Sequence, residues 1–470
     1  MKNSHIIVSA ISFIAAVYCL VALPLGFKVL AMLPFVFSVV FMFLFPISFR
    51  KASSRITVAL VYLLFFMRMV FIPVYGIIDG YYIGDVSSTL SKYCTMSVGL
   101  SLYEYVAVCG ILALIVLNNK ENNIRQTLNL AGNKTFYSIF VLVLIVLLVL
   151  LVARGQFVST FEFGFKSIGG DMERSGDIEE GGWGRLLVSI GVTFFYLLLT
   201  SYFVKKYRLS SAQKYVTYSI ILAMVMISII SGERRTSQLY KGFACIWLLI
   251  GVYPIYKKRV TSSLAVVAVI VIAGMTLYKQ YHAFLYETYA EALSHAHGIG
   301  MSTGILDAYF YGPNTISKNL AFADMGHLSL SNLLYDFARN IFGLNYIIPR
   351  GYPLTSELYN LTLSYGEEET GYLLSSVGYG YAFLGVGLAP IFTCFNVFVM
   401  LLLERAMRTT SSIEMSYIWA FLFMRFSFGF LGSFPPLINL TSRMLLVNGG
   451  IVLVAAFFNK SKTELPNEFK

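Results

Sequence analysis

Polar residues at helical spacing open one of the apolar segments of this chain. Ser231-Gly232-Glu233-Arg234-Arg235 precedes a run long enough to cross a membrane, and Gln238 and Lys241 follow Arg234 at intervals of four and three residues. This spacing puts them on one face of a helix, whose first turn offers free N–H groups to an anion. Arg234, Arg235 and Lys241 are therefore predicted to bind a phosphate group. The alternative is that the arginines reach the lipid headgroups or pair with the acid beside them.

Two histidines are candidates for proton transfer. His282 and His327 lie in a long polar, tyrosine-rich segment, 280–375. An imidazole with a pKa near 6.5 suits a general base at neutral pH. The alternative for each is an ordinary solvated loop histidine.

The same segment contains two arginines in positions that favour anion binding. Residues 331–342 are predicted to form an amphipathic helix lying along the membrane surface, with Arg339 at its polar edge. Arg350 lies in the turn sequence Pro-Arg-Gly-Tyr-Pro, which can hold a guanidinium for bidentate phosphate binding. Both are predicted phosphate-binding residues, although such turns also occur in loops without ligands.

Four charges lie inside apolar segments. Arg68 and Glu104 fall at similar depths and are predicted to pair, most simply in a structural role. Arg425 and Arg443 have no acid near them in their own helices. Either a water-filled cavity with an anionic ligand or helix-end carbonyls and a distant acid would satisfy them, and Arg443 is included among the predicted pyrophosphate-binding residues.

The elements that must position these residues are membrane spans. The chain is 57% hydrophobic and 13% charged, with a mean hydropathy of +0.72, which excludes an ordinary water-soluble domain. An all-α polytopic membrane protein with about 12 transmembrane helices is predicted, with windows of span length at 6–23, 29–47, 56–77, 98–117, 135–153, 185–204, 215–231, 236–256, 262–279, 376–403, 414–433 and 437–458.

The basic residues between these windows indicate the orientation. The short basic loops all fall on one side of the alternation, so both termini are predicted to be cytoplasmic. Three regions follow: a bundle of nine spans at 1–279 with an acidic, glycine-rich outer loop at 154–184, an extracytoplasmic catalytic loop at 280–375 that contains short helices, and three spans with a cytoplasmic tail at 376–470. The net charge of +11 is explained by this topology, and no nucleic-acid partner is required.

The five cysteines are scattered and no zinc spacing occurs, so neither a metal nor a cofactor is predicted.

Three short motifs carry a family resemblance. They are Thr370-Gly371-Tyr372-Leu373-Leu374-Ser375-Ser376-Val377-Gly378-Tyr379, then Phe383-Leu384-Gly385-Val386-Gly387, and the earlier Ser231–Arg235 stretch. Together with the large outer loop, they resemble the oligosaccharide repeat-unit polymerases, the O-antigen polymerase (Wzy) family. The arginine-ten-residues-glycine motif of some members is not found from Arg234, Arg235, Arg339 or Arg350, and Gly385 and Gly387 have an alternative role in close helix packing.

The resemblance implies a GT-C-like membrane glycosyltransferase in the bacterial cytoplasmic (inner) membrane. Such an enzyme polymerises undecaprenyl-pyrophosphate-linked oligosaccharide units at the outer, periplasmic face, and is metal-independent and inverting. The arginines and Lys241 would stabilise the leaving pyrophosphate, and His282 or His327 would accept the proton of the attacking hydroxyl. Membrane lipid, a chain-length regulator and a flippase of the same pathway are the implied partners.

Two other functions share this layout. An O-antigen ligase would deliver the finished glycan to another lipid acceptor. A flippase or carrier for lipid-linked oligosaccharides would use the intramembrane charges without forming a bond.

Overall fold

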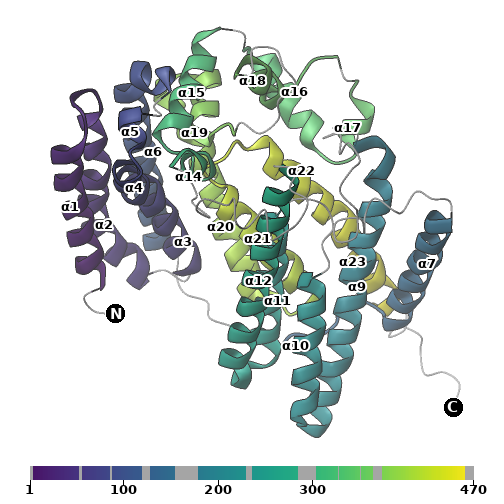
Figure 1. Cartoon of the computed structure of the whole chain (residues 1–470). Coiled ribbons are helices and arrows are strands. Elements are labelled where there is room, and N and C mark those ends of the chain that lie inside the picture. Colours follow the sequence, from purple (N-terminus) through teal and green to yellow (C-terminus); the bar gives the residue numbers. More distant parts are fainter. Residues whose placement is uncertain are drawn as a thin grey trace, which may run out of the picture. The chain divides into compact units, whose positions relative to one another are not determined.

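The chain is helical throughout the part that the computed structural model describes (Figure 1). The described residues are 4–51, 55–84, 87–118, 127–153, 178–228, 235–283, 303–326, 328–349, 351–363 and 373–460. Within these ranges the β structure amounts to two isolated bridges, Asn129 with Ser412 and Ser375 with Gly432. The predicted all-α class is therefore confirmed.

Six described helical segments are long and apolar enough to cross a membrane. They are His5–Ala22, Leu25–Phe49, Arg55–Ile78, Ser88–Val116, Val386–Thr409 and Pro435–Asn459. Two shorter apolar helices are Lys134–Leu147 and Gln238–Val252. A membrane protein is thus supported, whereas the total of twelve spans stays a prediction.

The helices form two compact units. The first unit comprises Met1–Asn123, Gly298–Arg405 and Arg425–Arg443, and the second comprises Ile124–His297, Ala406–Met424 and Met444–Lys470. Two helices, α20 (Ile391–Thr409) and α21 (Ile413–Gly429), contribute residues to both units.

The N-terminal helices of the first unit pack as neighbours. They are α1 (Ser4–Ala22), η1 (Leu25–Ala31), α2 (Met32–Lys51), α3 (Arg55–Phe66), η2 (Met67–Phe71), α4 (Ile72–Ile78), α5 (Tyr81–Gly84) and α6 (Ser88–Asn118). Helix α2 lies between α1 and α6 (Figure 1). Their apolar side chains account for both the packing and the many exposed hydrophobic positions, because lipid rather than water meets the outer faces of spanning helices.

An ion pair joins two of these segments. The element η2 is a π-helix that carries Arg68. Its Nη1 lies 2.5 Å from Oε2 of Glu104 on α6, and neither side chain is more than 1% exposed. Thr393 donates to the other carboxylate oxygen at 2.5 Å. The predicted pairing is confirmed, and it gives each buried charge the partner it needs away from water.

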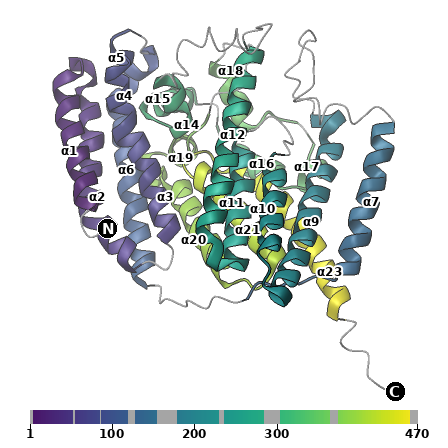
Figure 2. The ribbon, with the colours of Figure 1, turned by 60° about the horizontal axis from the view of Figure 1, so that its bottom comes forward.

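Short helices of the large loop pack on one end of the first unit. They are α14 (Thr303–Phe310), α15 (Pro313–Asp324), α16 (Leu330–Asn340), α17 (Leu344–Ile347) and α18 (Thr355–Leu363). Helix α15 packs against α6 (Figure 2). The carboxylate of Asp307 accepts from the backbone nitrogens of Asn314 at 3.0 Å and Thr315 at 2.7 Å, and so satisfies free donors at the α15 N-terminus. The predicted short helices of this segment are therefore present.

The two ends of the first unit are fixed by separate contacts. Thr303 donates through its nitrogen and hydroxyl to Asp79, which follows α4, at 3.0 and 2.8 Å. At the start of α3, the nitrogen of Thr57 donates to Glu404 of α20 at 2.8 Å. The loop helices thus lie at the end where α4 finishes, opposite the end where α3 begins.

The segment predicted as one span at 376–403 is broken. It consists of α19 (Ser376–Leu384), η5 (Val386–Leu388) and α20, with Gly385 between them at φ +74°. Neither Gly385 nor Gly387 packs closely, because a Cβ at either would meet no atom within 4 Å. The close approach is at Gly380, where a Cβ would lie 2.1 Å from the carbonyl oxygen of Ala389.

The last apolar segment also changes geometry, from α22 (Pro435–Arg443) through the π-helix η6 (Met444–Gly449) to α23 (Gly450–Lys460).

The second unit is built from long helices. They are α7 (Lys134–Ala153), α9 (Ile178–Ser210), α10 (Gln213–Ser228), α11 (Arg235–Val252), η4 (Pro254–Tyr256) and α12 (Lys257–Ala283), together with part of α21 and with η6 and α23. Helix α9 packs on α7 and α10, and α11 packs on α10 and α12. Most of the predicted outer loop at 154–184 lies outside the described residues, and 178–184 begin α9.

Candidate functional site

The predicted site residues fall in both units. Arg234, His327 and Arg350 lie outside the described residues, whereas Arg235 begins α11 and His282 lies near the end of α12. Lys241 belongs to the second unit, on α11. Arg339 on α16 and Arg443 on α22 belong to the first.

Helix α11 buries the predicted polar stripe. Gln238 is fully buried and Lys241 is 7% exposed. Neither the oxygen nor the nitrogen of the Gln238 amide has a hydrogen-bond partner in the described part of the chain. A buried amide without partners destabilises a fold by about 1–3 kcal/mol. This face of α11 therefore carries a buried cation and, one turn away, an amide that could hydrogen-bond a polar ligand.

Arg339 has a structural use. Its Nη1 donates to the carbonyl oxygens of Asn345 and, at 2.7 Å, Ile348. These bonds hold the turn that follows α16 against the helix. The predicted amphipathic helix is thus present, and its arginine supports the backbone of the next turn in addition to any role toward an anion.

Arg443 lies beside the same turn. The nitrogen of Phe342 donates to the hydroxyl of Ser442 at 2.9 Å, and Arg443 is the next residue and the last of α22. Ser442, the residue before Arg443, thus contacts the turn between α16 and α17, whose carbonyls and those after it are bonded by Arg339.

A small recess of about 20 Å³ lies in the first unit, where α16, α18 and α19 meet the chain before α22. Its lining combines a carboxylate, an amide, hydroxyls and apolar groups: Asp336, Asn340, Leu354, Ser356, Leu374, Tyr379, Ser433, Pro435 and Pro436. A recess of this size has room for about one water molecule, and its lining can hydrogen-bond that water or a single hydroxyl group that reaches it. The sequence analysis did not identify this recess.

Asp336 is the carboxyl group of the recess. It is 2% exposed, and its two oxygens accept from the nitrogen of Thr355 at 3.0 Å and the hydroxyl of Tyr379 at 2.9 Å. Burial raises the pKa of Asp336 above its ordinary value, and the hydrogen bonds from Thr355 and Tyr379 oppose that rise. A carboxylate with a raised pKa is a better proton acceptor near neutral pH.

Asn319 fixes the start of α19, which carries Tyr379. Its side-chain oxygen accepts from the nitrogen of Ser375 at 3.0 Å and the hydroxyl of Ser375 at 2.5 Å. Its nitrogen donates to Tyr359 at 2.7 Å. The hydroxyl of Ser375 then accepts from the nitrogen of Gly378 at 2.9 Å, which caps the helix. The Ser-Ser-Val-Gly motif thus has a clear local role, namely a tightly packed helix start beside the recess.

A sequence signal for Asp336 existed. The residue lies at the edge of the apolar stripe of the predicted helix, about 60° around the helix from Leu333. An acid on that stripe has to be buried with partners when the stripe packs. Its partners, Thr355 and Tyr379, come from other helices, so the pattern of α16 does not identify them.

The absence of metal-binding clusters among the described residues and of matches to known proteins completes the description of the site. In the described part of the chain, no group of three or more His, Cys, Asp or Glu side chains is placed to hold a metal ion. Searches of protein-family models, of curated proteins and of solved structures find no match to this chain.

Proposed function

We propose that this protein is a membrane glycosyltransferase that polymerises lipid-pyrophosphate-linked oligosaccharide units at the outer face of the bacterial cytoplasmic membrane. The observation that carries the proposal is the buried face of α11. The Gln238 amide lies in an apolar helix beside the buried Lys241, and an amide without hydrogen bonds in the described part of the chain is costly there unless a polar ligand meets it. A diphosphate on a lipid carrier fits this chemistry.

The proposed reaction transfers the growing glycan to a new unit. A hydroxyl of the terminal sugar of the acceptor attacks the anomeric carbon of the donor glycan. A carbon–oxygen bond forms there while the bond from that carbon to the pyrophosphate breaks, and the lipid diphosphate leaves with the electron pair. The attack inverts the anomeric centre, and a base takes the hydroxyl proton.

Each group of residues has its own role in this proposal. Arg234, Arg235 and Lys241 stabilise the charge that accumulates on the diphosphate, and Arg339, Arg350 and Arg443 are further candidates for the same role. The base is assigned to His282, His327 or Asp336. Of these three, Asp336 is the residue whose surroundings are described, and its raised pKa and its place in a polar recess support it.

The test is reconstitution with one defined lipid-linked repeat unit. We expect Arg234→Ala, Arg235→Ala and Lys241→Met each to lower the rate of chain extension by about 10²–10³-fold, as loss of a transition-state donor does. Lys257→Met is the matched control, because Lys257 is exposed at the start of α12. Normal extension in all three variants would refute the proposed diphosphate site.

The product distinguishes a polymerase from a ligase. A polymerase gives a ladder of chains that differ by one repeat unit, and its loss leaves the single unit. A ligase requires a second lipid acceptor, and its loss leaves that acceptor without glycan. Formation of a ladder from the repeat unit alone supports the proposal, and dependence on a second acceptor contradicts it.

A further inference from the structure

Exposed basic residues gather at one end of three neighbouring helices in the second unit. Helix α10 packs against both α9 and α12. Lys206 lies near the end of α9, Lys214 is the second residue of α10, and Arg259 is the third residue of α12. All three residues are exposed. Because α9 ends where α10 begins, these cations share one end of the three helices.

Side-chain contacts hold the cations on a common surface. Nη2 of Arg259 donates to the hydroxyl of Thr217 on α10 at 3.3 Å. Thr217 follows Lys214 by three residues, so it lies on the same face of α10, one turn along the helix. On α9, the ammonium of Lys206 lies over the ring of Tyr202, 5.8 Å from the ring centre. The guanidinium of Arg259 is therefore held within about one helical turn of Lys214.

The sequence places no acid beside these cations. Neither 199–218 nor 251–270 contains an aspartate or a glutamate, and Lys205, next to Lys206, is exposed as well. None of the three cations forms an ion pair with an acid in the part of the chain that the structure describes. An unbalanced positive surface of this kind attracts an anion.

An exposed apolar lane begins directly below Lys214 on α10. Tyr218, Ile221 and Val225 follow it at intervals of four, three and four residues, which puts all of them on one helical face. Their exposed fractions are 46%, 51% and 50%. Eleven residues separate Lys214 from Val225, about 16 Å at 1.5 Å per residue. One leaflet of the hydrocarbon layer is about 15 Å deep, so the lane has the length of a single leaflet.

Helix α12 repeats this arrangement beside α10. Val266 and Val269 follow Arg259 by seven and ten residues and are 57% and 65% exposed. They lie on the face of α12 that carries the arginine. Two adjacent helices thus present a cation at the headgroup level and an apolar lane below it.

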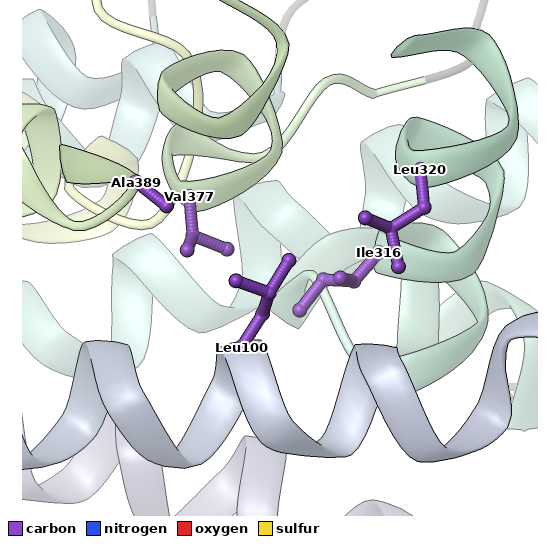
Figure 3. Packing of buried hydrophobic residues seen from close by; sticks show 5 residues of the cluster. All are labelled: Leu100, Ile316, Leu320, Val377 and Ala389. Carbon is purple, nitrogen blue, oxygen red and sulfur yellow. The ribbon is translucent and has the colours of Figure 1, made fainter. Parts of the chain in front are cut away.

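The face of α6 around Leu100 shows the contrasting case, a helix surface covered by protein. Leu100 is buried there against residues of α15, of α19 and of the chain before α20: Ile316, Leu320, Val377 and Ala389 (Figure 3). Tyr218, Ile221 and Val225 have no comparable cover among the described residues, since about half of each side chain is exposed. The lane on α10 is therefore open to lipid.

We infer that Lys206, Lys214 and Arg259 bind the phosphate of an anionic phospholipid, whose acyl chain lies along the lane of α10. A free phosphate would use the cations but leave the lane without a ligand, whereas a phospholipid uses both. The positive-inside rule assigns this end of the helices to the cytoplasmic leaflet, where anionic lipids attract basic residues. The inference does not depend on the proposed function.

The test is a lipid titration of the full-length, detergent-purified protein, read by native mass spectrometry. The probe is dioleoyl-phosphatidylglycerol, and dioleoyl-phosphatidylcholine has the same acyl chains without the net charge. We expect the wild type to bind phosphatidylglycerol at least about tenfold more tightly. Lys206→Gln/Lys214→Gln should weaken that binding by about 25-fold, since each basic residue contributes about fivefold.

The matched control is Lys28→Gln/Lys92→Gln, which removes the same charge from η1 and α6 of the first unit. It should keep the affinity for phosphatidylglycerol within about twofold. The melting temperature of both double variants should equal that of the wild type, because the substituted lysines are exposed or half-exposed.

Four results would overturn the inference. The first is equal affinity of the wild type for the two lipids. The second is wild-type affinity for phosphatidylglycerol in Lys206→Gln/Lys214→Gln, or an equal loss in the control variant, which would show an effect of net charge alone. The third is displacement of phosphatidylglycerol by an equal concentration of inorganic phosphate, which would show a site for small anions. The fourth is tighter binding of a glutamate-rich peptide at the same residues, which would assign the surface to an acidic protein segment.

Discussion

Asp336 illustrates how a single buried charge constrains the chemistry of a site. Its carboxylate has two fixed hydrogen-bond donors and borders a recess. A carboxyl group is a base only when it is deprotonated. Because burial raises the pKa of Asp336, activity that depends on it should fall as the pH is lowered through that raised value, earlier than for an exposed aspartate.

We predict that Asp336→Asn abolishes most turnover. Asparagine keeps the size of the side chain but cannot take the proton, so the rate should fall by about 10²–10⁴-fold. The measurement is the pH–rate profile of glycan extension with one lipid-linked repeat unit. Asp324→Asn is the control, since Asp324 is an exposed acid of the same loop, and it should keep the wild-type profile.

The two histidines are the competing assignments for the base. His282→Gln and His327→Gln are expected to keep the low-pH decline of the rate if Asp336 is the base. A histidine base would instead give a decline near pH 6.5, which its own substitution would remove. Wild-type turnover in Asp336→Asn, together with loss of turnover in one histidine variant, would exclude Asp336.

At the scale of the element, the glycines near the break between α19 and α20 have different structural roles. We predict that Gly380→Ala destabilises the protein most, because its Cβ would lie 2.1 Å from the carbonyl oxygen of Ala389. Gly385→Ala should cost about 1–3 kcal/mol, the penalty for a backbone conformation that is essentially restricted to glycine. Gly387→Ala should be neutral within about 0.5 kcal/mol. Thermal unfolding of the detergent-purified variants measures this order, and a neutral Gly380→Ala would contradict the packing described.

In the second unit, the Glu414 carboxylate holds the segment before α7 through hydrogen bonds. Its carboxylate accepts from the nitrogens of Ala131 and Gly132, both at 3.0 Å, from Tyr137 at 2.9 Å and from Ser412 at 2.7 Å. These groups are buried or partly buried, so the carboxylate has little access to water as an alternative partner.

We predict that Glu414→Gln lowers the free energy of unfolding by about 1–3 kcal/mol. The amide of glutamine would bring N–H groups toward N–H and O–H donors and leave some of them unsatisfied. The melting temperature of the purified protein is the measurement, with Glu357→Gln as the control at an exposed position. An unchanged melting temperature in Glu414→Gln would show that this carboxylate does not hold the segment.

Helix content was predictable from the sequence, but helix continuity was not. Hydropathy windows average composition over span length, so they locate apolar segments such as 376–403 and 437–458. They do not detect a single residue at positive φ, as at Gly385, or a change to π-helical geometry, as at Met444–Gly449. These features are set by backbone angles and by packing against residues far away in the sequence.

At the scale of the whole molecule, the sequence predicts an ion pair only where two charged residues lie at similar depths in their membrane spans. Arg68 and Glu104 were predicted as partners because both are counted inward from one short connection, and the ion pair is present. The recess could not be predicted, because Asp336, Thr355 and Tyr379 come from three helices whose packing is not encoded in any one periodicity. The sequence also does not predict the bonds of Arg339 to backbone carbonyls. Every residue has a backbone carbonyl, so the residue type does not show which one accepts.

The orientation of the first unit gives a prediction for the molecule in its membrane. Tyr309 is exposed among the loop helices, at the end where Asp79 meets Thr303, and Arg405 follows the Glu404 that caps α3 at the other end. We expect Tyr309→Cys to react with a membrane-impermeant maleimide in intact cells. Arg405→Cys should react only after the membrane is made permeable, with a difference of at least about tenfold, because the basic loops are predicted to be cytoplasmic.

The five native cysteines make this measurement feasible, since four are buried and Cys394 is partly buried, so background labelling should be low. The opposite pattern, with Arg405→Cys labelled in intact cells, would put the loop helices and the recess in the cytoplasm. The recess would then face a compartment that supplies nucleotide sugars rather than lipid-linked repeat units already moved across the membrane, and the proposed role of Asp336 in polymerisation would fail even if its variants lose activity. Topology therefore has to be established before any loss of turnover is assigned to chemistry.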